Sequence, residues 1–299
     1  MTEAPKHVPV LLQIAIRMLN VRRGGTYMDA TLGLAGHASE IARRLGPEGT
    51  LIGFDRDPEA MALAQQKLAA LAAEIGPEMP KLVLHDVEFS QIGDVLAGTR
   101  LDGLLADFGV SSLQFDQAHR GFSFQADAAL DMRMNPRSGP TAAQVVNQAG
   151  ENELANLIYE FGEERRSRRI ARAIVRSRPV TTTAQLARIV AGAAGAMKGE
   201  RIHPATRTFQ ALRIYVNAEL SEIEALLRLA PRILKPGGRL VAISFHSLED
   251  RRVKDALREG ARQGVYEVLT RKPVTAEEAE TDRNPRARSA KLRAAQRKE

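Results

Sequence analysis

The sequence lacks cysteine and tryptophan, and no apolar run approaches the roughly 18 residues that a membrane-spanning helix needs. Without cysteine there is no disulfide, no thiol nucleophile and no cysteine-ligated zinc, which suits a reducing cytoplasm. Residues 1–10 contain an acid and prolines but no cationic segment followed by an apolar one, so we expect no signal peptide. The six histidines are scattered without ligand spacing, so we expect no metal site.

The positive charge is concentrated in two short segments. The 299 residues carry a formal net charge of +7. Residues 163–178 hold seven Arg against two Glu, and residues 281–299 hold seven Lys and Arg against two acids. Clustered cations favour a polyanionic partner, and nucleic acid is the first candidate. The alternative is a solvated helix face and a frayed tail.

The first part of the chain alternates short apolar runs with helical patterns. Strand signals at 26–33, 50–55, 81–86 and 101–109 end in Gly or Asp, and helices separate them. This pattern predicts a parallel sheet with helices on both faces. Because the crossovers are right-handed, the carboxyl ends of these strands should meet at one edge of the sheet.

The pattern changes after residue 112. Residues 115–140 are rich in Gly, Pro and Asp and indicate a loop. Helical patterns follow at 141–161, 163–178, 183–197 and 205–230, then a strand at 239–246, a helix at 248–259 and a strand at 264–270. We therefore expect a discontinuous α/β domain of residues 1–114 and 207–299, interrupted by a helical insertion at 115–206.

A loop of small residues follows the first strand. Residues 29–37 (DATLGLAGH) end that strand and open a helix, where the backbone can approach a ligand beside free N–H groups. Asp55 ends the second strand about 20 residues further on, where an acid typically binds the ribose hydroxyls of a nucleotide cofactor. The alternatives are a tight structural turn for the loop and a helix cap before Pro58 for Asp55.

Two further strand ends point to the same edge. Residues 85–89 follow the third strand, where their side chains would flank an adenine ring. Asp107 ends the apolar fourth strand, and a part-buried carboxylate there needs a partner such as the cationic end of a cofactor or a substrate amine. These residues do not decide whether the cofactor is a nicotinamide dinucleotide or S-adenosylmethionine. The loop lacks the G-x-G-x-x-G spacing and so favours the second slightly.

Motifs along nearly the whole chain carry a family resemblance. They are His7-x-Pro9-Val10-Leu11, Asp29–His37, Asp55-x-Asp57-Pro58, Asp102–Asp107, Gly109–Ser112, Arg120–Phe124, Leu130–Met134, Phe161–Glu164, His203–Gln210, Gly237–Leu240, Ile243–Arg251 and Asn284–Ser289. With these motifs the chain resembles the ribosomal RNA small subunit methyltransferase H family, which methylates N4 of a cytidine in the decoding region of 16S rRNA. The resemblance implies an α/β fold: a Rossmann-like S-adenosylmethionine-dependent methyltransferase core, with an antiparallel last strand and an inserted all-helical domain for RNA recognition.

The resemblance also implies the cofactor and the partners. The cofactor is S-adenosyl-L-methionine, and the partner is 16S rRNA within the small ribosomal subunit, in the cytoplasm. The sequence does not decide the oligomeric state, and a homodimer is one alternative. The implied cofactor contacts are Gly33, Ala35, Gly36, His37, Asp55, Phe89, Asp107 and Gln114. Two positions depart from the usual family residues: Ala35 stands for Gly, and Phe108 stands for Leu.

Two residues are candidates for the chemistry. Cytosine N4 is a poor nucleophile because its lone pair is shared with the ring, so an acceptor for the amino protons would favour the transition state. Asp107 and the turn that follows it to Ser112 are the expected acceptors; the alternative is that Asp107 only holds the cofactor. His246, at the end of the fifth strand, is the second candidate, as a proton acceptor or a base-binding residue. The alternative is a hydrogen-bonded structural histidine.

Candidate RNA contacts lie on helical stripes, in an aromatic loop and in the C-terminal tail. One stripe consists of Arg165, Arg169, Arg172 and Arg176, opposite apolar residues, as on a docked helix that offers arginines to phosphates. Another consists of Thr206, Gln210, Arg213 and Asn217. The other cationic candidates are Arg207, Arg286 and Arg288, and residues 284–293 lack the apolar content to fold alone. Phe108, Phe115, Phe122 and Phe124 form an aromatic loop, whose exposed members would stack on an extruded base. The alternative is that these side chains seal the insertion to the core.

Other functions remain to be separated from this one. A related enzyme would methylate amino groups on DNA or another RNA. A protein of a different class would be a noncatalytic ribosome-assembly factor that binds nucleotide and RNA. A third alternative is a nicotinamide-dependent oxidoreductase.

Overall fold

The computed structural model describes residues 9–195 and 203–299 and divides into two compact units. The first unit is Met1–Gly109 with Leu220–Glu299, and the second is Val110–Glu219. The second unit begins five residues before the insertion expected at 115–206 and ends 13 residues after it. The later end arises because the helix that follows residue 205 packs within this unit. His7 and the end of the helix expected at 183–197 lie outside the described residues.

The first unit is built on a seven-stranded sheet in the order β3-β2-β1-β4-β5-β7-β6. Its strands are β1 (Thr26–Asp29), β2 (Thr50–Phe54), β3 (Lys81–His85), β4 (Leu101–Asp107), β5 (Leu234–Ser244), β6 (Tyr266–Val268) and β7 (Lys291–Arg297). Strands β1 to β5 pair in parallel, and β7 runs antiparallel to both β5 and β6. This confirms the expected Rossmann-like sheet. The winding direction reverses between β1 and β4, and such a switch point is where open α/β sheets bind ligands.

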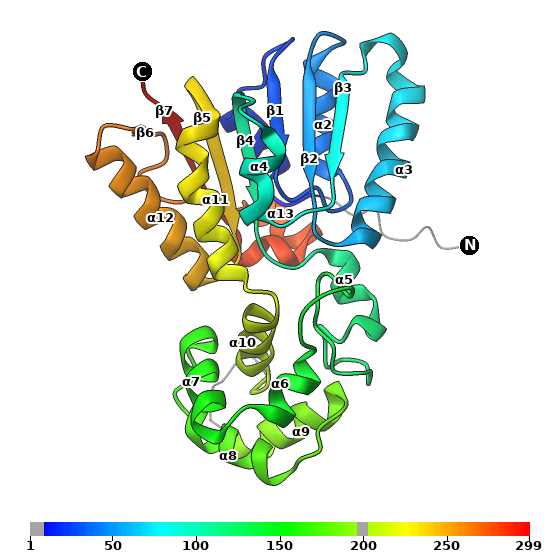
Figure 1. The fold of residues 1–299 in the computed structure, drawn as a ribbon, viewed down its shortest axis with the longest axis vertical. Helices are drawn as coiled ribbons and strands as arrows, with labels where there is room; N and C mark the ends of the chain where they lie inside the picture. The colour runs from blue at the N-terminus through cyan, green and yellow to red at the C-terminus, as the bar shows by residue number, and fades with distance from the viewer. Residues whose placement is uncertain (1–8, 196–202) are drawn as a thin grey trace. The chain divides into compact units, whose positions relative to one another are not determined.

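Helices cover both faces of this sheet. They are α1 (Leu12–Leu19), α2 (Gly36–Leu45), α3 (Pro58–Ile75), α4 (Ile92–Leu96), α11 (Glu219–Ile233), α12 (Ser247–Arg262) and α13 (Glu278–Arg283), with short 3-10 turns at Gly76–Glu78, Phe89–Gln91 and Pro285–Ser289. In Figure 1, α4 and α11 lie in front of the sheet and α2 lies behind it. Leu104, Leu105 and Ala106 in β4 are fully buried, as in a parallel strand covered on both sides.

The C-terminal segment is part of the sheet, so the alternative of a frayed tail is wrong. β7 pairs with β5 along six residues, and Leu292 and Ala294 are fully buried. Arg293, counted as a tail cation, lies 2.6 Å from Asp250. The apolar content of the tail is low, but its backbone satisfies the open edge of β5.

The second unit is helical. It contains α5 (Ser112–Asp116), α6 (Ala142–Gln148), α7 (Glu151–Gly162), α8 (Ser167–Arg176), α9 (Thr183–Ala194) and α10 (Thr206–Val216), with a 3-10 turn at Ala118–Arg120. The helix expected at 141–161 is two helices, which separate at Ala149 and Gly150. None of the described helices is long and apolar enough to cross a membrane.

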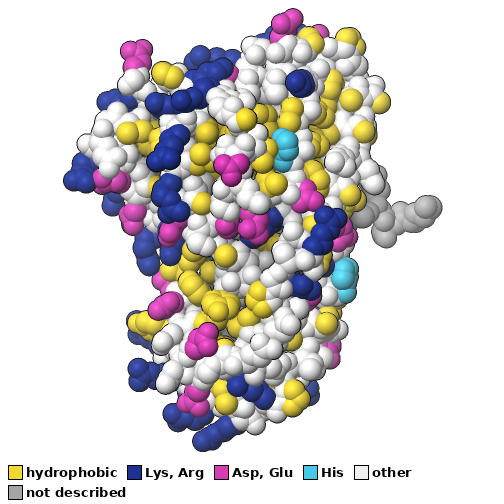
Figure 2. Space-filling model, in the orientation of Figure 1, with side chains coloured by type: hydrophobic (Ala, Val, Ile, Leu, Met, Phe, Trp, Pro, Cys, Tyr) yellow, Lys and Arg dark blue, Asp and Glu magenta, His cyan; other side chains and the backbone are white. Residues whose placement is uncertain are grey.

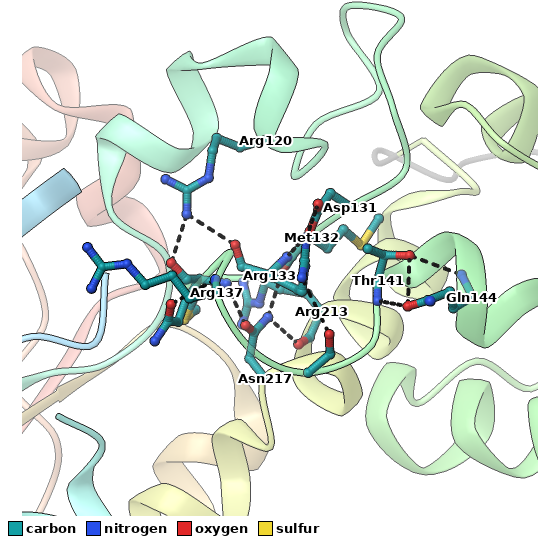
Figure 3. A network of polar contacts seen from close by, with 12 residues as sticks. Arg120, Asp131, Met132, Arg133, Arg137, Thr141, Gln144, Arg213 and Asn217 are labelled. Carbon is teal, nitrogen blue, oxygen red and sulfur yellow. Dashed lines mark hydrogen bonds and ion pairs between the residues drawn. The ribbon is translucent and has the colours of Figure 1, made fainter. Parts of the chain in front are cut away.

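The single helix expected at 205–230 ends at Val216, and the next residue, Asn217, binds the backbone of a distant loop. The Asn217 side chain accepts a hydrogen bond from Met134 N at 2.7 Å and donates one to Met132 O at 2.7 Å (Figure 3). Arg120 donates to the carbonyl of Met134 in the same loop. A buried asparagine and a buried arginine therefore organise a segment that the sequence indicates only as a loop.

Candidate functional site

Three carboxyl groups lie at the carboxyl ends of neighbouring parallel strands in the first unit. Asp29 ends β1, Asp55 follows β2 and Asp107 ends β4. Backbone contacts tie these ends together, since Gly33 N donates to Asp55 Oδ2 at 2.7 Å and Asp107 N donates to Thr31 Oγ1 at 2.6 Å. The edge expected from the βαβ pattern therefore brings these groups together.

The loop after β1 has the close backbone approach that its small residues indicate. Gly33 and Ala35 have φ of 50° and 55°, in the left-handed region that favours glycine. Ala35 adopts this conformation with a methyl group, at the position where the resembled family usually has Gly. A Cβ built on Gly36 would collide with the ring of Pro9. Gly36 then opens α2, whose first N–H groups face the strand ends.

Asp55 is held by the backbone and is not the cap of the following helix. Its Oδ2 accepts from Gly33 N, and its Oδ1 accepts from Asp57 N at 2.9 Å. The cap of α3 is Asp57, which accepts from Glu59 N at 3.1 Å, so the helix-cap alternative for Asp55 is wrong. Burial raises the pKa of Asp55 to about 6. Each carboxylate oxygen keeps a second lone pair, which is what a ribose diol needs.

Asp107 has the strongest electrostatic perturbation at this edge. Its side chain is 22% exposed, yet Oδ1 is buried without a hydrogen-bond partner among the described residues. Its Oδ2 lies 3.7 Å from His37 Nδ1. Burial, with further contributions from Asp29 and Glu249, raises the pKa of Asp107 well above its ordinary value. A cationic or hydrogen-bond-donating ligand would supply the partner that Oδ1 lacks.

Asp29 is a site residue that the sequence analysis quoted only as part of the loop. It is 1% exposed and accepts from Thr31 N at 3.1 Å. Burial raises the pKa of Asp29 to about 7, and the charge of Asp55 adds to this. Its place at the end of an apolar strand is the same signal that singled out Asp107. Neighbouring buried carboxyl groups cannot all ionise without a compensating cation.

The aromatic candidates lie in different environments. Phe89 opens a 3-10 turn after β3, and its ring packs edge-on against Phe108 with centroids 6.1 Å apart. Phe108 is buried, so the usual Leu is replaced by another packed apolar side chain. In the second unit Phe122 is buried and Phe124 packs against Phe209, so both belong to the hydrophobic core of that unit. Phe115 remains 38% exposed.

Gln114 lies in the second unit and has a structural contact there. Its side-chain oxygen accepts from Ser111 N at 3.1 Å, and its own N–H donates to Ser111 Oγ at 3.3 Å. This reciprocal pair caps α5. The expected cofactor contact of Gln114 stays a prediction.

His246 precedes α12 and is bound by that helix. Its Nε2 lies 3.0 Å from Glu249 Oε1, and its side chain is 12% exposed. The other oxygen of Glu249 accepts from Phe245 N at 2.7 Å and from His246 N at 3.3 Å. These contacts suit the structural alternative, and the catalytic role of His246 stays a prediction. Glu249, fully buried, is a residue that the sequence analysis missed because nothing in its helical pattern marks it.

The arginines of α8 form the expected amphipathic arrangement. Arg169, Arg172 and Arg176 are exposed, whereas Ile170 and Ile174 are fully buried. Arg165 is also exposed but precedes the helix, and Arg172 pairs with Glu151 at 3.2 Å. Figure 2 shows Lys and Arg side chains gathered over the part of the molecule where Figure 1 draws α8.

The second stripe, of Thr206, Gln210, Arg213 and Asn217, is not an exposed face. Arg213 donates two hydrogen bonds of 2.8 Å to Glu219, and its side chain is 13% exposed, so it is already paired within the protein. Its assignment as a phosphate contact stays a prediction. Arg207 is 43% exposed with Glu164 at 3.9 Å. Arg286 and Arg288 are exposed on the 3-10 turn before β7.

The fold and the site define a class of protein. A doubly wound sheet with a small-residue loop, an acid after β2 and a part-buried acid after β4 at the switch point is the arrangement of a Rossmann-like, S-adenosylmethionine-dependent methyltransferase. The family model described as "MraW methylase family" matches residues 4–298, and the chain belongs to this family. The expected cofactor, S-adenosyl-L-methionine, is thereby confirmed.

Close relatives cover the whole chain. The chain is 77% identical over 296 residues to a protein of Acidobacterium capsulatum, covering 99% of this chain and 100% of the relative. It is 58% identical to a protein of Koribacter versatilis, covering 98% and 94%, and 50% identical to one of a Cyanothece strain, covering 97% and 94%. All three relatives are named ribosomal RNA small subunit methyltransferase H.

Proposed function

We propose that this protein transfers a methyl group from S-adenosylmethionine to N4 of a cytidine in the decoding region of 16S rRNA. The observation that carries the proposal is Asp107, a carboxyl group at the switch point with one buried, unpartnered oxygen. The names of the close relatives support ribosomal RNA of the small subunit as the substrate class. We further propose that the protein acts in the cytoplasm on rRNA within the small subunit, with a homodimer as one possible state of the enzyme.

Different residues of the first unit bind different parts of the cofactor. Asp55 accepts the ribose hydroxyls, the backbone of Gly33 to His37 faces the carboxylate end of the cofactor, and Phe89 flanks the adenine. Asp107 lies where a cation is needed. When bound, the cofactor supplies a methyl group activated on a sulfonium. Alignment of that group with the acceptor nitrogen provides much of the rate acceleration.

Asp107 also acts on the acceptor. As a carboxylate it accepts a hydrogen bond from the N4 amino group, so the nitrogen lone pair is less shared with the ring as the new bond forms. The same carboxylate then takes up the amino proton. His246 is the alternative acceptor, although its position against Glu249 favours a structural role.

The second unit is proposed to hold the RNA. Residues 110–219 contain fifteen Lys and Arg against ten acids, so most of the net positive charge falls in this unit. The exposed arginines of α8 contact phosphates, and the exposed Phe115 stacks on a base. Arg207, Arg286 and Arg288 are further phosphate contacts.

The test is mass mapping of 16S rRNA from cells with and without this protein, together with transfer of labelled methyl groups into isolated small subunits. We expect one cytidine to lose a methyl group in the deletion strain and to regain it in vitro. Label on naked DNA would favour an amino-methyltransferase of another specificity. Binding of small subunits without any transfer would favour a noncatalytic assembly factor, and binding of nicotinamide dinucleotides would favour an oxidoreductase.

A further inference from the structure

The segment before α1 lies against the cofactor loop. The ring of Pro9 occupies the space that a Cβ on Gly36 would need. The carbonyl oxygen of Val10 lies 3.1 Å from His37 Nε2, and both residues are buried. This short segment therefore forms one wall of the loop that opens α2.

The next residue is held in a conformation that needs support. Leu11 has φ of 55° and ψ of 28°, in the left-handed region that a branched aliphatic residue rarely adopts. Its N–H donates to Glu280 Oε1 at 2.7 Å, a hydrogen bond to a carboxylate across 269 residues of sequence. Glu280 belongs to α13, which Figure 1 shows at the carboxyl edge of the sheet.

The hydrogen bond of Val10 sets the orientation of His37. A carbonyl oxygen can only accept, so Nε2 of His37 carries the hydrogen and Nδ1 is turned toward Asp107 Oδ2 at 3.7 Å. The other acids that act on Asp107 are Asp29 of β1 and Glu249 of α12. His37 is thus the imidazole that faces the acid placed at the centre of the site.

We propose that Glu280 is a positioning residue of the cofactor site. Its carboxylate accepts a hydrogen bond from Leu11 N–H and so fixes the backbone of this segment. The fixed backbone holds the Val10 carbonyl oxygen within hydrogen-bond distance of His37 Nε2. This hydrogen bond in turn orients His37 Nδ1 toward Asp107. The inference rests on the proposed function for the importance of Asp107, but it does not depend on which RNA is methylated. The acidic helix α13, which no motif of the sequence singles out, acquires a role through this contact.

Three variants test the contact. Glu280→Ala removes the acceptor, Glu280→Gln keeps a carbonyl oxygen at the same reach, and Glu278→Ala removes an exposed acid from the same helix as a control. The first measurement is the tautomer of His37 by nitrogen-15 NMR of the free protein, which has only six histidines to assign. The second is the dissociation constant for S-adenosylmethionine by calorimetry.

We expect His37 to be the Nε2–H tautomer in the wild type, in Glu280→Gln and in Glu278→Ala. In Glu280→Ala we expect a mixture of the two tautomers. Cofactor affinity should fall about tenfold in Glu280→Ala, as expected for one hydrogen bond to a charged group, and by less than about threefold in the other two. If Glu280→Ala does not fold, Glu280→Asp, one methylene too short, carries the same prediction.

An unchanged His37 tautomer with affinity within about twofold of wild type in Glu280→Ala would overturn the proposal. A loss in Glu280→Gln equal to that in Glu280→Ala would overturn it as well, because the retained oxygen should rescue the contact. Neither measurement uses RNA, so a failed methylation of 16S rRNA would count against the proposed function alone.

Discussion

Replacing Asp107 with Asn separates the two roles that this carboxyl group can have. Asn has nearly the same size and keeps an oxygen acceptor, but it carries no charge and takes up no proton. An acceptor of the amino proton contributes about 10²- to 10⁴-fold to the rate, which is about 3 to 5 kcal/mol. We therefore expect kcat to fall by that factor.

Cofactor binding should change much less in the same variant. A hydrogen bond between a charged pair contributes about 1.5 to 3 kcal/mol, and the 22% exposure of the Asp107 side chain places the value near the lower end. The dissociation constant for S-adenosylmethionine should then rise about tenfold. Because burial raises the pKa of Asp107, the Asn variant should also be more stable than wild type at pH 8, by more than at pH 5.

The assay is single-turnover methylation of small subunits, with calorimetric titration of the cofactor. Asp55→Asn is the matched control, because Asp55 is proposed to bind the ribose and to have no part in the chemistry. The dissociation constant of this variant for S-adenosylmethionine should rise while its kcat stays within about threefold of wild type. The acceptor role of Asp107 is refuted if kcat of Asp107→Asn stays within about threefold of wild type while the cofactor binds about a hundredfold more weakly.

Three further predictions follow from the contacts. Burial raises the pKa of Asp29 from 3.8 to about 7, so between these pH values the folded protein holds a proton that the unfolded chain has lost. Asp29 should therefore lower the free energy of unfolding of the cofactor-free protein by about 4 kcal/mol as pH rises through this range. In urea unfolding, Asp29→Asn should show a smaller fall, and the part that remains comes from Asp55 and Asp107, whose pKa values are also raised. Asn217→Ala leaves two buried backbone groups without partners and should lower the free energy of unfolding by about 2 to 4 kcal/mol, whereas a loss below about 1 kcal/mol would contradict the role assigned to that side chain. Replacing Arg169, Arg172 and Arg176 of α8 with Gln should weaken rRNA binding and lower its salt dependence by about two to three counterions. Arg258→Gln, exposed on α12, is the control that leaves the slope unchanged.

The parallel half of the sheet and its ligand-binding edge were predictable from local patterns. Each of the first four strands is a short apolar run that ends in Asp or is followed directly by Asp, and parallel strands place such ends together whatever their distant neighbours are. Asp55 and Asp107 could therefore be named before the structure. The arginine face of α8 was predictable for the same reason, since the helical period alone separates its exposed and buried sides.

Other features depend on groups that are far apart in the sequence. The helix break at Asn217 exists because a loop about 80 residues earlier leaves backbone groups that need a partner. Arg213 lies at a position where the helical period predicts a surface residue, but it forms an ion pair with Glu219. No helical or strand pattern distinguishes such residues from their exposed counterparts.

By itself, then, the sequence determined the fold class, the family and the edge of the sheet where Asp55 and Asp107 meet, because these follow from periodicity and from motifs that are contiguous in the chain. Only the tertiary structure decided that the C-terminal residues complete the sheet as β7, that Asp29 joins Asp107 in one buried cluster, and that Glu280 contacts Leu11. Pairing of an open strand edge, repulsion between buried charges and a hydrogen bond across 269 residues depend on distances in space, which local sequence patterns do not contain.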